Sequence, residues 1–266
     1  MPLRIATWNI NSVRLRLPIV AKLARERKVD VLCLQETKVA DAQFPHKAIR
    51  KLGFEHVAIN GQKGYHGVAI LSRVPFGKTD ARDFCAKGDA RHMCVTLPGA
   101  IELHNFYVPA GGDIPDSKAN PKFAHKLQFL DEMERMFAGM KSKGSARRVV
   151  VGDLNVAPFE HDVWSHKQLL NVVSHTPPET ERLGRLYAAH DWIDVTRSFV
   201  PKDQKIFSWW SYRNQDWKKS DRGRRLDHVW VSPALKGSVG SHEILRQARD
   251  WKRPSDHVPI VVDIAA

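Results

Sequence analysis

The sequence predicts an α/β fold in which two mixed β-sheets pack face to face and carry helices on their outer faces. Short apolar runs typical of buried strands alternate with helical segments in two βαβ-like stretches, and a hairpin-rich middle separates them. Short polar segments also recur at the ends of predicted strands, from residue 8 to residue 257. Because these groups must converge on one place, we expect residues 1–266 to form a single domain.

Eight apolar runs have the length and composition of buried strands. They are residues 3–8, 29–35, 68–71, 93–97, 101–108, 148–151, 226–231 and 258–264. A helix is expected after the first strand with Pro18 in its first turn, where proline is well tolerated. An apolar stripe indicates a second helix, and we interpret its residues as core: Phe123, Leu127, Leu130, Phe137 and Met140.

Composition points to an ordinary globular protein. Hydrophobic residues make up 42% of the 266 residues, which is enough for a sizeable core. The first residues lead into a strand without the apolar segment of a secretion signal, and no apolar run approaches the roughly 20 residues of a membrane helix. Cys33, Cys85 and Cys94 lack metal-ligand spacing, so we expect reduced cysteines in a cytoplasmic protein.

The charge favours a polyanionic partner, because the formal net charge is +13. Residues 201–225 concentrate this charge, with eight Lys and Arg against three Asp. Aromatic side chains are interleaved with them: Phe207, Trp209, Trp210, Tyr212 and Trp217. Basic groups neutralise phosphates and exposed aromatics stack on bases, so the segment indicates contact with nucleic acid. The alternative is a solvated loop whose two tryptophans belong to the core.

Five polar segments carry the chemistry that the chain offers. They are Trp8-Asn9-Ile10-Asn11, Gln35-Glu36-Thr37-Lys38, Gly152-Asp153-Leu154-Asn155, Arg225-Leu226-Asp227-His228 and Ser255-Asp256-His257. A carboxylate, amide or imidazole at the rim of a sheet is costly to desolvate unless it is paired or has a function. Their recurrence at five rims therefore predicts one active site assembled from strand ends.

Glu36 ends an apolar strand, and Asn9 and Asn11 end a neighbouring one. Together they would form an oxygen-rich pocket, which suits Mg²⁺ or Mn²⁺. The alternative is an ion pair between Glu36 and Lys38 or an arginine at the end of the sheet.

The remaining segments suit phosphoryl transfer. Asp153 and Asn155 lie two residues apart on a tight turn and can hold a water between them, with Asp153 as base or orienting group. A histidinium at His257 would stabilise charge on a phosphate, and Asp227 could fix its tautomer. Each motif alone is weak, but the full set in this order is a strong signal.

With these residues in place, the chain resembles the exonuclease III and apurinic/apyrimidinic endonuclease branch of the DNase I-like endonuclease/exonuclease/phosphatase superfamily. The resemblance covers essentially the whole chain. Besides the five polar segments, it rests on Gly61-Gln62-Lys63-Gly64-Tyr65-His66-Gly67-Val68-Ala69, Asn105-Phe106-Tyr107-Val108-Pro109, and Phe207-Ser208-Trp209-Trp210-Ser211-Tyr212-Arg213. Related inositol phosphatases and sphingomyelinases would not be expected to carry the last of these.

The resemblance implies a four-layer α-β-β-α sandwich forming one catalytic domain. It also implies a monomeric, Mg²⁺-dependent phosphodiesterase, with Mn²⁺ as a substitute, acting on double-stranded DNA. Its expected substrates are abasic sites, cleaved on the 5′ side, and 3′ termini, from which blocking groups or nucleotides are removed.

The matched positions imply roles for individual residues. The catalytic set is Tyr107, Asp153, Asn155, Asp227 and His257. The metal set is Asn9, Glu36, Asp153, Asn155, Asp256 and His257, with Glu36 as the main carboxylate and Asn11 nearby. The DNA-binding set is Gly64, Tyr65, Lys126, Trp209 and Arg213, with Trp209 lining the pocket for a flipped, baseless sugar.

Two features depart from the family pattern. Ala110 follows Tyr107-Val108-Pro109 where relatives usually carry Gln or Asn, so one phosphate hydrogen bond is expected to be missing. The segment 158–178 is hard to align, and its histidines (His161, His166 and His175) would touch DNA, narrow the pocket, bind a metal or simply lie on the surface. We therefore expect 3′-end processing to be at least as strong as abasic-site incision.

Two other functions remain open on the sequence alone. The same skeleton serves phosphatases of small or lipid phosphates, although the net charge of +13 and the basic aromatic segment argue against such a substrate. A DNA-binding module that has lost catalysis is the other, but all expected catalytic positions are occupied.

Overall fold

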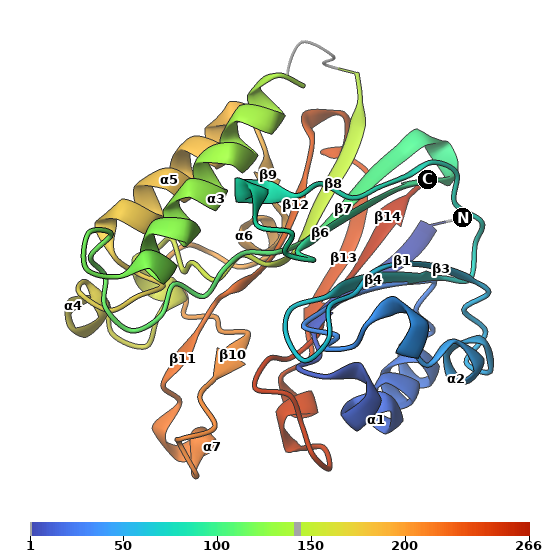
Figure 1. Ribbon diagram of the computed structural model, residues 1–266, viewed down its shortest axis with the longest axis horizontal. Coiled ribbons are helices and arrows are strands. Elements are labelled where there is room, and N and C mark those ends of the chain that lie inside the picture. Colours follow the sequence, from blue (N-terminus) through green and yellow to red (C-terminus); the bar gives the residue numbers. More distant parts are fainter. Residues whose placement is uncertain (1, 141–144) are drawn as a thin grey trace.

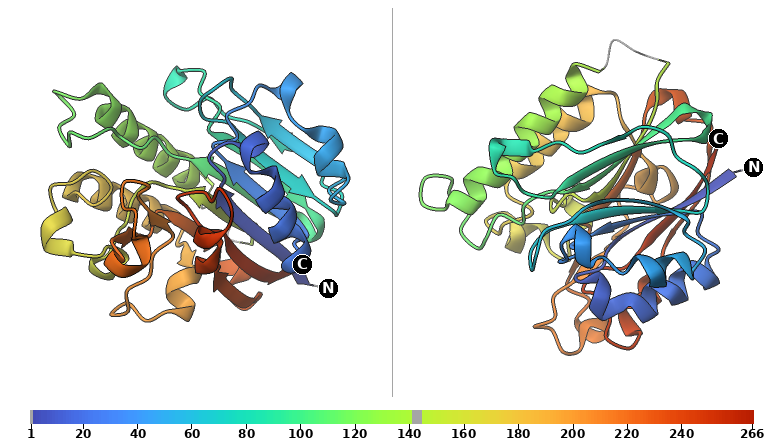
Figure 2. Two further views of the ribbon diagram at one scale, coloured as in Figure 1. Left: turned by 90° about the horizontal axis from the view of Figure 1, so that it is seen from below. Right: turned by 45° about the vertical axis from the view of Figure 1, so that its right-hand side comes forward.

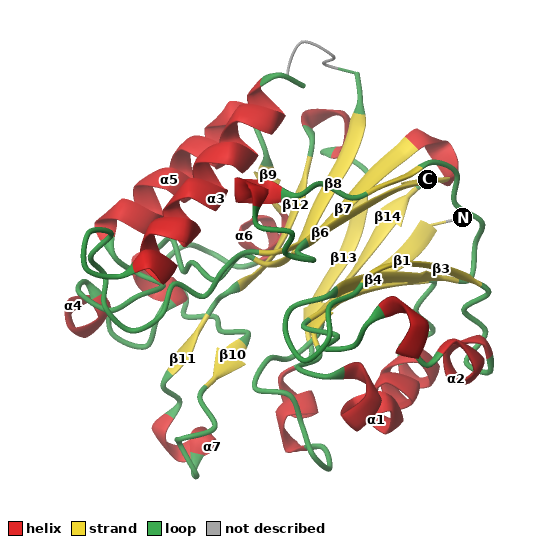
Figure 3. Cartoon of the chain, viewed as in Figure 1, coloured by secondary structure: helices red, strands yellow, loops and turns green. Residues whose placement is uncertain are grey.

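The computed structural model describes residues 2–140 and 145–266. Two six-stranded mixed sheets pack face to face (Figures 1 and 3). The first has the order β13-β14-β1-β2-β4-β3 and the second β5-β6-β7-β8-β12-β9. The first sheet consists of β1 (Pro2–Asn9), β2 (Val31–Gln35), β3 (His56–Asn60), β4 (Val68–Ser72), β13 (Val239–Ile244) and β14 (Ile260–Ala265). The second consists of β5 (Thr79–Asp80), β6 (His92–Leu97), β7 (Ile101–Tyr107), β8 (Arg147–Asp153), β9 (Ile193–Asp194) and β12 (Asp227–Val231).

Helices cover both outer faces, which confirms the four-layer α-β-β-α sandwich (Figure 2). The first sheet carries α1 (Val13–Glu26) and α2 (His46–Arg50), and the second carries α3 (Pro121–Ala138) and α5 (Pro177–Ala189). Three short helices lie in the connections: α4 (His166–Leu169), α6 (Val195–Phe199) and α7 (Trp217–Ser220). A small hairpin of β10 (Trp209–Trp210) and β11 (Gly223–Arg224) projects from the sandwich with α7 at its tip. Within the described residues, no helix has the length and apolarity needed to cross a membrane.

The core between the sheets follows from alternation along the strands. Alternate residues of β1, β2 and β4 point inward and meet those of β6, β7, β8 and β12. The inward residues include Ile5, Val31, Cys33, Val68, Ile70, Val95, Leu103, Val149, Val151 and Val229. The opposite faces of the same strands pack on the helices, so most strands are buried on both sides and are apolar throughout. Each fully buried aliphatic side chain contributes about 1.5–3 kcal/mol.

The eight predicted strands are present, but the prediction for the first helix was wrong. Helix α1 begins at Val13, so Pro18 lies inside it and not in its first turn. The earlier start follows from hydrogen bonds across the sheet edge. The amide of Ser12 donates to the carbonyl of Glu36 at 2.7 Å, and that of Val13 to Thr37 at 3.2 Å. These bonds satisfy N–H groups that a helix start leaves open, and they tie the β1–α1 turn to the end of β2.

Two buried, neutral histidines, His92 of β6 and His104 of β7, belong to one relay of hydrogen bonds. The amide of Arg82 donates to Nδ1 of His92 at 3.2 Å. Nε2 of His92 therefore carries the hydrogen and faces Nδ1 of His104 at 3.2 Å, and Nε2 of His104 faces Sγ of Cys94 at 3.7 Å. Burial lowers the pKa of His92 to about 3 and that of His104 well below its ordinary value. Protonation of either ring would break this relay.

We therefore predict that the protein loses stability as the pH falls from about 6.5 toward 4. The unfolded histidines titrate near 6.5, so below this pH the unfolded state binds more protons than the folded state. His228, whose pKa burial lowers to about 4, adds to the effect. Urea denaturation should give a free energy of unfolding lower by about 2 kcal/mol or more at pH 5 than at pH 7.

The matched variant is His92→Asn, which keeps an acceptor for the Arg82 amide but cannot take up a proton. Its free energy of unfolding should depend less steeply on pH than that of the wild type. Equal pH dependence in the two proteins would contradict the assignment of His92 as a buried neutral histidine.

Candidate active site at the edge between the two sheets

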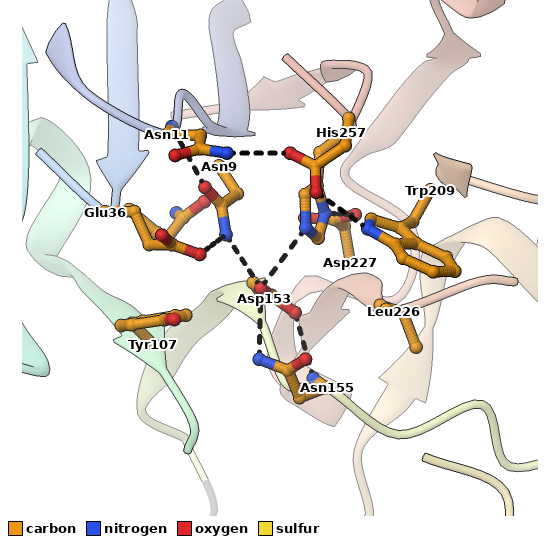
Figure 4. Close-up of polar contacts among 12 residues, drawn as sticks. Asn9, Asn11, Glu36, Tyr107, Asp153, Asn155, Trp209, Leu226, Asp227 and His257 are labelled. Atoms are coloured by element: carbon orange, nitrogen blue, oxygen red, sulfur yellow. Dashed lines mark hydrogen bonds and ion pairs between the residues drawn. The ribbon is translucent and has the colours of Figure 1, made fainter. Parts of the chain in front are cut away.

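Strand register brings the polar segments to one edge of the sandwich. In the first sheet, parallel pairing of β1 and β2 sets Asn9 beside Gln35, so Glu36 follows at the same edge. In the second sheet, Asp153 at the end of β8 pairs with Tyr107 of β7 on one side and with Asp227 of β12 on the other. The strand ends of the two sheets face each other there (Figure 4).

Asn9 connects the two sheets directly. Its Nδ2 donates to Oε1 of Glu36 at 2.9 Å, within the first sheet, and to Oδ2 of Asp153 at 2.9 Å, in the second. Its backbone carbonyl accepts from the hydroxyl of Ser255 at 2.7 Å, which holds the segment that precedes β14. Asn9 is fully buried, so both donated bonds are shielded from water.

His257 forms the second connection between the sheets. Its Nδ1 lies 2.8 Å from Oδ2 of Asp227, and its Nε2 lies 3.6 Å from Oδ2 of Asp153. Burial alone would lower the pKa of His257, but the two carboxylates outweigh burial and raise it to about 10. The ring is therefore an imidazolium at neutral pH, and Asp227 holds it. Ser208 supports Asp227 by donating from its hydroxyl to Oδ2 at 2.6 Å.

Asp153 is the carboxylate best suited to act as a base. Burial raises its pKa to about 7, although His257 and Asn9 act in the opposite direction. Asn155 donates to it twice. Its backbone N–H donates to Oδ1 at 3.0 Å, and its side-chain Nδ2 donates to Oδ2 at 3.1 Å. Nδ2 of Asn155 also donates to the carbonyl of Val108 at 2.9 Å. Asn155 thus orients Asp153, and the water expected between the two stays a prediction.

The surroundings of Glu36 fit both interpretations made from the sequence, the metal site and the ion pair with Lys38. Nζ of Lys38 lies 2.8 Å from Oε2 of Glu36 and donates to Oδ1 of Asn11 at 2.5 Å. The predicted ion pair therefore forms, and its ammonium occupies a position lined by two side-chain oxygens. That position is one where a hard cation would bind, so the donor set fits Mg²⁺ or Mn²⁺. The pKa of Glu36 is lowered because Lys38 and Asn9 outweigh its burial.

Asp153, Asp227 and His257 are the three-residue group of acidic and imidazole ligands that lies close enough together to hold an ion, within the described ranges. A second ion there would compete with the Asp227–His257 pair.

Backbone strain is concentrated at this edge. Four polar residues of the site have positive φ angles without being glycine: Asn11 (48°), Glu36 (51°), Lys38 (52°) and Asn155 (54°). Such conformations cost about 1–3 kcal/mol each, with asparagine at the low end, and they persist where the surroundings hold them. Their grouping at the strand ends is typical of a functional site.

Tyr107 lies on the opposite wall from His257 (Figure 4). Burial and the carboxylates of Glu36 and Asp153 raise its pKa well above the ordinary value, so the phenol keeps its proton. The guanidinium of Arg91 stacks on its ring, with Cζ 4.9 Å from the ring centre. Tyr65, 69% exposed, lies at the outer end of a row of rings that runs through His66 to Tyr107.

Asp256 and Trp209 connect the site to the projecting hairpin. Oδ1 of Asp256 accepts from Nδ2 of Asn11 at 3.1 Å, and its Oδ2 accepts from Nε1 of Trp209 at 3.0 Å. The backbone of Trp209 also bridges to that of His257. Asp256 therefore binds its neighbours through both oxygens, and its role as a metal ligand stays a prediction.

Beside Trp209 lies a pocket of about 820 Å³. Its wall combines residues 164–173 with the hairpin, and it includes Trp164, Val172, Val173, Trp209, Arg213, Arg222 and Arg224. The segment 158–178 therefore lies at the pocket, as expected, but contributes apolar groups and not its histidines.

The three histidines of that segment have different environments. His175 is buried, with Nδ1 2.6 Å from the carbonyl of Ala157 and Nε2 2.7 Å from Nδ1 of His166. It is therefore a structural residue of the segment and not a surface histidine. His161 and His166 are partly exposed. Within residues 2–140 and 145–266, no group of three ligands includes any of them, so the metal interpretation gains no support.

Lys126 was wrongly assigned to DNA binding. Its side chain is 0% exposed, and its ammonium forms an ion pair with the equally buried Glu179. The ammonium also donates to the carbonyl of Asn155 at 2.7 Å and to that of Ala110 at 3.3 Å. Lys126 therefore holds the turn that carries Asn155 from behind and cannot reach a phosphate.

The basic aromatic segment 201–225 divides between surface and core. Arg225 is fully buried and bonds Asp162 through two nitrogens at 2.8 Å and Asp194 at 2.8 Å, so its charge is neutralised inside the protein. Trp210 and Trp217 are core residues, as the alternative interpretation held. Trp209 and the exposed Tyr212 and Arg213 remain available to a ligand.

Gly64, another residue predicted to contact DNA, lies in an open loop with a φ of 79°.

Sequence reasoning missed several residues that build the site. Arg91, which stacks on Tyr107, lies outside every motif, and no sequence signal pointed to it. Ser208 stood inside the Trp209 motif, but nothing indicated that it would support Asp227. Trp8 stood inside the first polar segment, but nothing indicated that its Nε1 would donate to the carbonyl of His257, at 2.9 Å.

The sandwich and the polar cluster at its edge define a DNase I-like fold, and comparisons with known proteins agree. The model of the endonuclease/exonuclease/phosphatase family matches residues 6–257. Exodeoxyribonuclease III of Haemophilus influenzae is 30% identical over 274 residues, covering 97% of this chain and 98% of that protein.

Two solved structures are also similar, each covering 99% of this chain and 100% of its own. An AP endonuclease from Archaeoglobus fulgidus superposes with a TM-score of 0.90 at 30% identity. The 3′ phosphatase NExo from Neisseria, bound to a product DNA hairpin, does so with a TM-score of 0.90 at 28% identity. The chain belongs to the endonuclease/exonuclease/phosphatase family, within its exonuclease III and AP endonuclease branch, and is a nuclease.

The corrected role of Lys126 gives a stability prediction. Lys126→Met leaves the buried carboxylate of Glu179 without its cation, although the amides of Ser174 and Thr176 still donate to it, and should lower the free energy of unfolding by about 3–5 kcal/mol. The double variant Lys126→Met/Glu179→Gln should recover part of this loss, because a neutral side-chain amide can still accept from Ser174 and Thr176 and no buried charge then lacks a counterion. Lys122→Met, an exposed change on the same helix, is the control. Urea denaturation decides, and a Lys126→Met protein as stable as the control would contradict the buried pair.

Proposed function

We propose that this protein is a Mg²⁺-dependent DNA-repair phosphodiesterase that acts on double-stranded DNA at abasic sites and at 3′ termini, in the cytoplasm and as a monomer. The observation that carries the proposal is the buried cluster of Asp153, Asp227 and His257, which lies across the sheet edge from Glu36. The cluster supplies a base and a fixed cation, and Glu36 supplies a carboxylate for a metal. All of them lie beside an exposed basic aromatic hairpin. The names of the relatives, among them an exodeoxyribonuclease III and an AP endonuclease, support the same activity.

The metal would be held by Glu36, with the oxygens of Asn9 and Asn11 nearby. Bound there, Mg²⁺ would neutralise charge on the scissile phosphate and make it more open to attack. Lys38, whose ammonium lies at this position, would then move toward the solvent or toward the substrate.

The chain's own residues supply the proton steps. Asp153, with a pKa of about 7, accepts a proton from the attacking water at its carboxylate. His257, held as an imidazolium by Asp227, donates a hydrogen bond from Nε2 to the phosphoryl oxygen and stabilises the charge that develops there. Tyr107 keeps its phenolic proton and can donate it toward the leaving oxygen.

The pocket beside Trp209 supports a preference for 3′ ends. A flipped abasic sugar with DNA continuing on both sides needs a bent duplex and an open pocket, whereas a 3′ terminus needs less room. Val172 and Val173 line the pocket, and Arg224 lies on the ring of Trp209 with Cζ 5.2 Å from the ring centre, so both occupy space that a flipped sugar would need. Ala110 removes one hydrogen bond to phosphate. We therefore expect 3′-end processing to be at least as strong as abasic incision.

The metal assignment predicts that Glu36→Gln abolishes most of the activity on a 3′-blocked duplex, because the main carboxylate for the cation is lost. The fold should be intact, and raising the Mg²⁺ concentration should restore part of the rate. Glu55→Gln, an exposed carboxylate change outside the site, is the control. Identical Mg²⁺ dependence in Glu36→Gln and the wild type would contradict the assignment.

The catalytic assignment predicts that Asp153→Asn and His257→Ala each lower kcat by at least about 10². The affinity for DNA should change little, because both side chains act on charges that develop during the reaction. Single-turnover rates and equilibrium binding measured on one duplex separate the two effects. A variant that mainly weakens binding would make its residue a positioning contact.

The substrate prediction is tested on three duplexes that carry an internal abasic analogue, a 3′-phosphate or a plain recessed 3′-hydroxyl. The rate on the 3′-phosphate should equal or exceed the rate on the abasic analogue. Trp209→Ala should slow abasic incision more than phosphate removal, because only the abasic sugar must enter the pocket. Abasic incision that is faster by orders of magnitude would show that the pocket is open and overturn the preference.

A further inference from the structure

The wall of the pocket beside Trp209 contains a half-buried cation without an ion-pair partner. Arg224 forms no salt bridge with any described residue, in contrast to its neighbour Arg225, which is paired with Asp162 and Asp194. Burial lowers the pKa of Arg224, and Glu179 is the acidic group that acts against this shift. An arginine remains charged nevertheless, so a cation is kept in the protein wall without a counterion.

The position of Arg224 is fixed by contacts that use only one of its nitrogens. Nη1 donates to the carbonyl of Val173 at 2.9 Å and to the hydroxyl of Ser174 at 2.7 Å. Ser174 has a φ of 91°, and its amide donates to Glu179, so the backbone that presents this hydroxyl is itself held in place. The guanidinium is thus oriented before any ligand arrives.

The other two side-chain nitrogens of Arg224 have no hydrogen-bond partner among the described residues. Nε is buried and has no hydrogen-bond partner, and Nη2 has none in the described part of the chain. A buried donor without a partner costs about 1–3 kcal/mol, and a planar guanidinium fork matches a carboxylate or phosphate. Asp113 is the acidic residue on the pocket wall, where Arg213 and Arg222 add further positive charge. The pocket therefore suits an anion.

Trp209 sets the distance between this cation and the catalytic cluster. One edge of its indole donates to Asp256 at 3.0 Å, beside His257, and the guanidinium of Arg224 lies on its ring. Arg224 is therefore separated from the catalytic residues by one indole. An anionic group joined to the scissile phosphate by a short linker would span such a separation.

We propose that Arg224 forms a receptor for an anionic group located beyond the scissile phosphate, so that the enzyme prefers 3′ blocking groups that carry a carboxylate or phosphate of their own. The inference rests on the proposed function, because it assumes that the scissile phosphate binds at His257. It names the class of 3′ ends that this site selects, which neither the fold nor the catalytic cluster specifies.

The test compares two duplexes that differ in one group. Both carry a 3′-phosphodiester to a two-carbon block, which ends in a carboxylate in the glycolate and in a neutral amide in the glycolamide. Kd is measured for each by fluorescence anisotropy, in EDTA and at fixed ionic strength, so that no turnover is needed. The wild type should bind the glycolate end at least about tenfold more tightly, since a charge-assisted hydrogen bond is at stake.

Variants of Arg224 assign this preference to the residue. Arg224→Leu should bring the ratio of the two Kd values close to one, and Arg224→Lys, which keeps the charge but loses the fork, should retain part of the preference. Lys219→Leu removes a positive charge from an exposed position of the hairpin that does not line the pocket, and it should change both Kd values by the same factor. Circular dichroism melting checks that each variant is folded.

A wild-type ratio near one would overturn the inference, whether or not Arg224→Leu folds. An unchanged ratio in folded Arg224→Leu would also overturn it and leave Arg224 a structural contact for Val173 and Ser174. Rates with Mg²⁺ are measured separately on the same duplexes. A protein that prefers the glycolate end but hydrolyses neither duplex would contradict the proposed function while supporting the anion receptor.

Discussion

The structure depends on a set of buried hydrogen bonds and ion pairs that connect the ends of two different sheets. Asn9 of the first sheet donates to Asp153 of the second, and His257, which precedes β14 of the first, pairs with Asp227 of the second. Charged groups of this kind are costly to bury unless they are paired, so the two sheets must pack in the one register that pairs them. The same constraint that fixes the packing also brings together Asp153, His257 and Glu36, which we propose as the base, the phosphate-stabilising cation and the metal ligand.

The proposed proton chemistry follows from where each group lies and not from its residue type. Asp153 and Asp227 both flank His257, yet burial raises the pKa of Asp153 to about 7, while Asp227 bonds Nδ1 of the imidazole. Asn155 and Lys126 hold the turn behind Asp153, and Glu36, the proposed metal ligand, has a positive φ of 51°. A phosphate bound between these walls would meet groups whose positions are already fixed, which is the condition for effective electrostatic catalysis.

Much of this arrangement could be predicted from the sequence, because its signals are local. Apolar runs predict strands, and the polar segments that follow them predict an edge, so the fold class and the residues Asn9, Glu36, Asp153, Asp227 and His257 were within reach. Lys126, Arg225 and Arg224 look alike in sequence, but one braces a turn, one is neutralised in the core and one remains unpaired. Only the long-range contacts that folding creates distinguish them. The predicted start of the first helix near Pro18 was too late for the same reason, because hydrogen bonds to the end of β2 start the helix at Val13.

The central claim is that Asp227 acts through His257 as one unit across the two sheets, and a double-mutant cycle tests it most directly. The variants Asp227→Asn, His257→Gln and the double variant are compared by kcat/KM on one 3′-blocked duplex. If Asp227 works only by holding the imidazolium, the double variant should be as slow as His257→Gln alone. Losses that multiply in the double variant would show two independent residues and contradict the account.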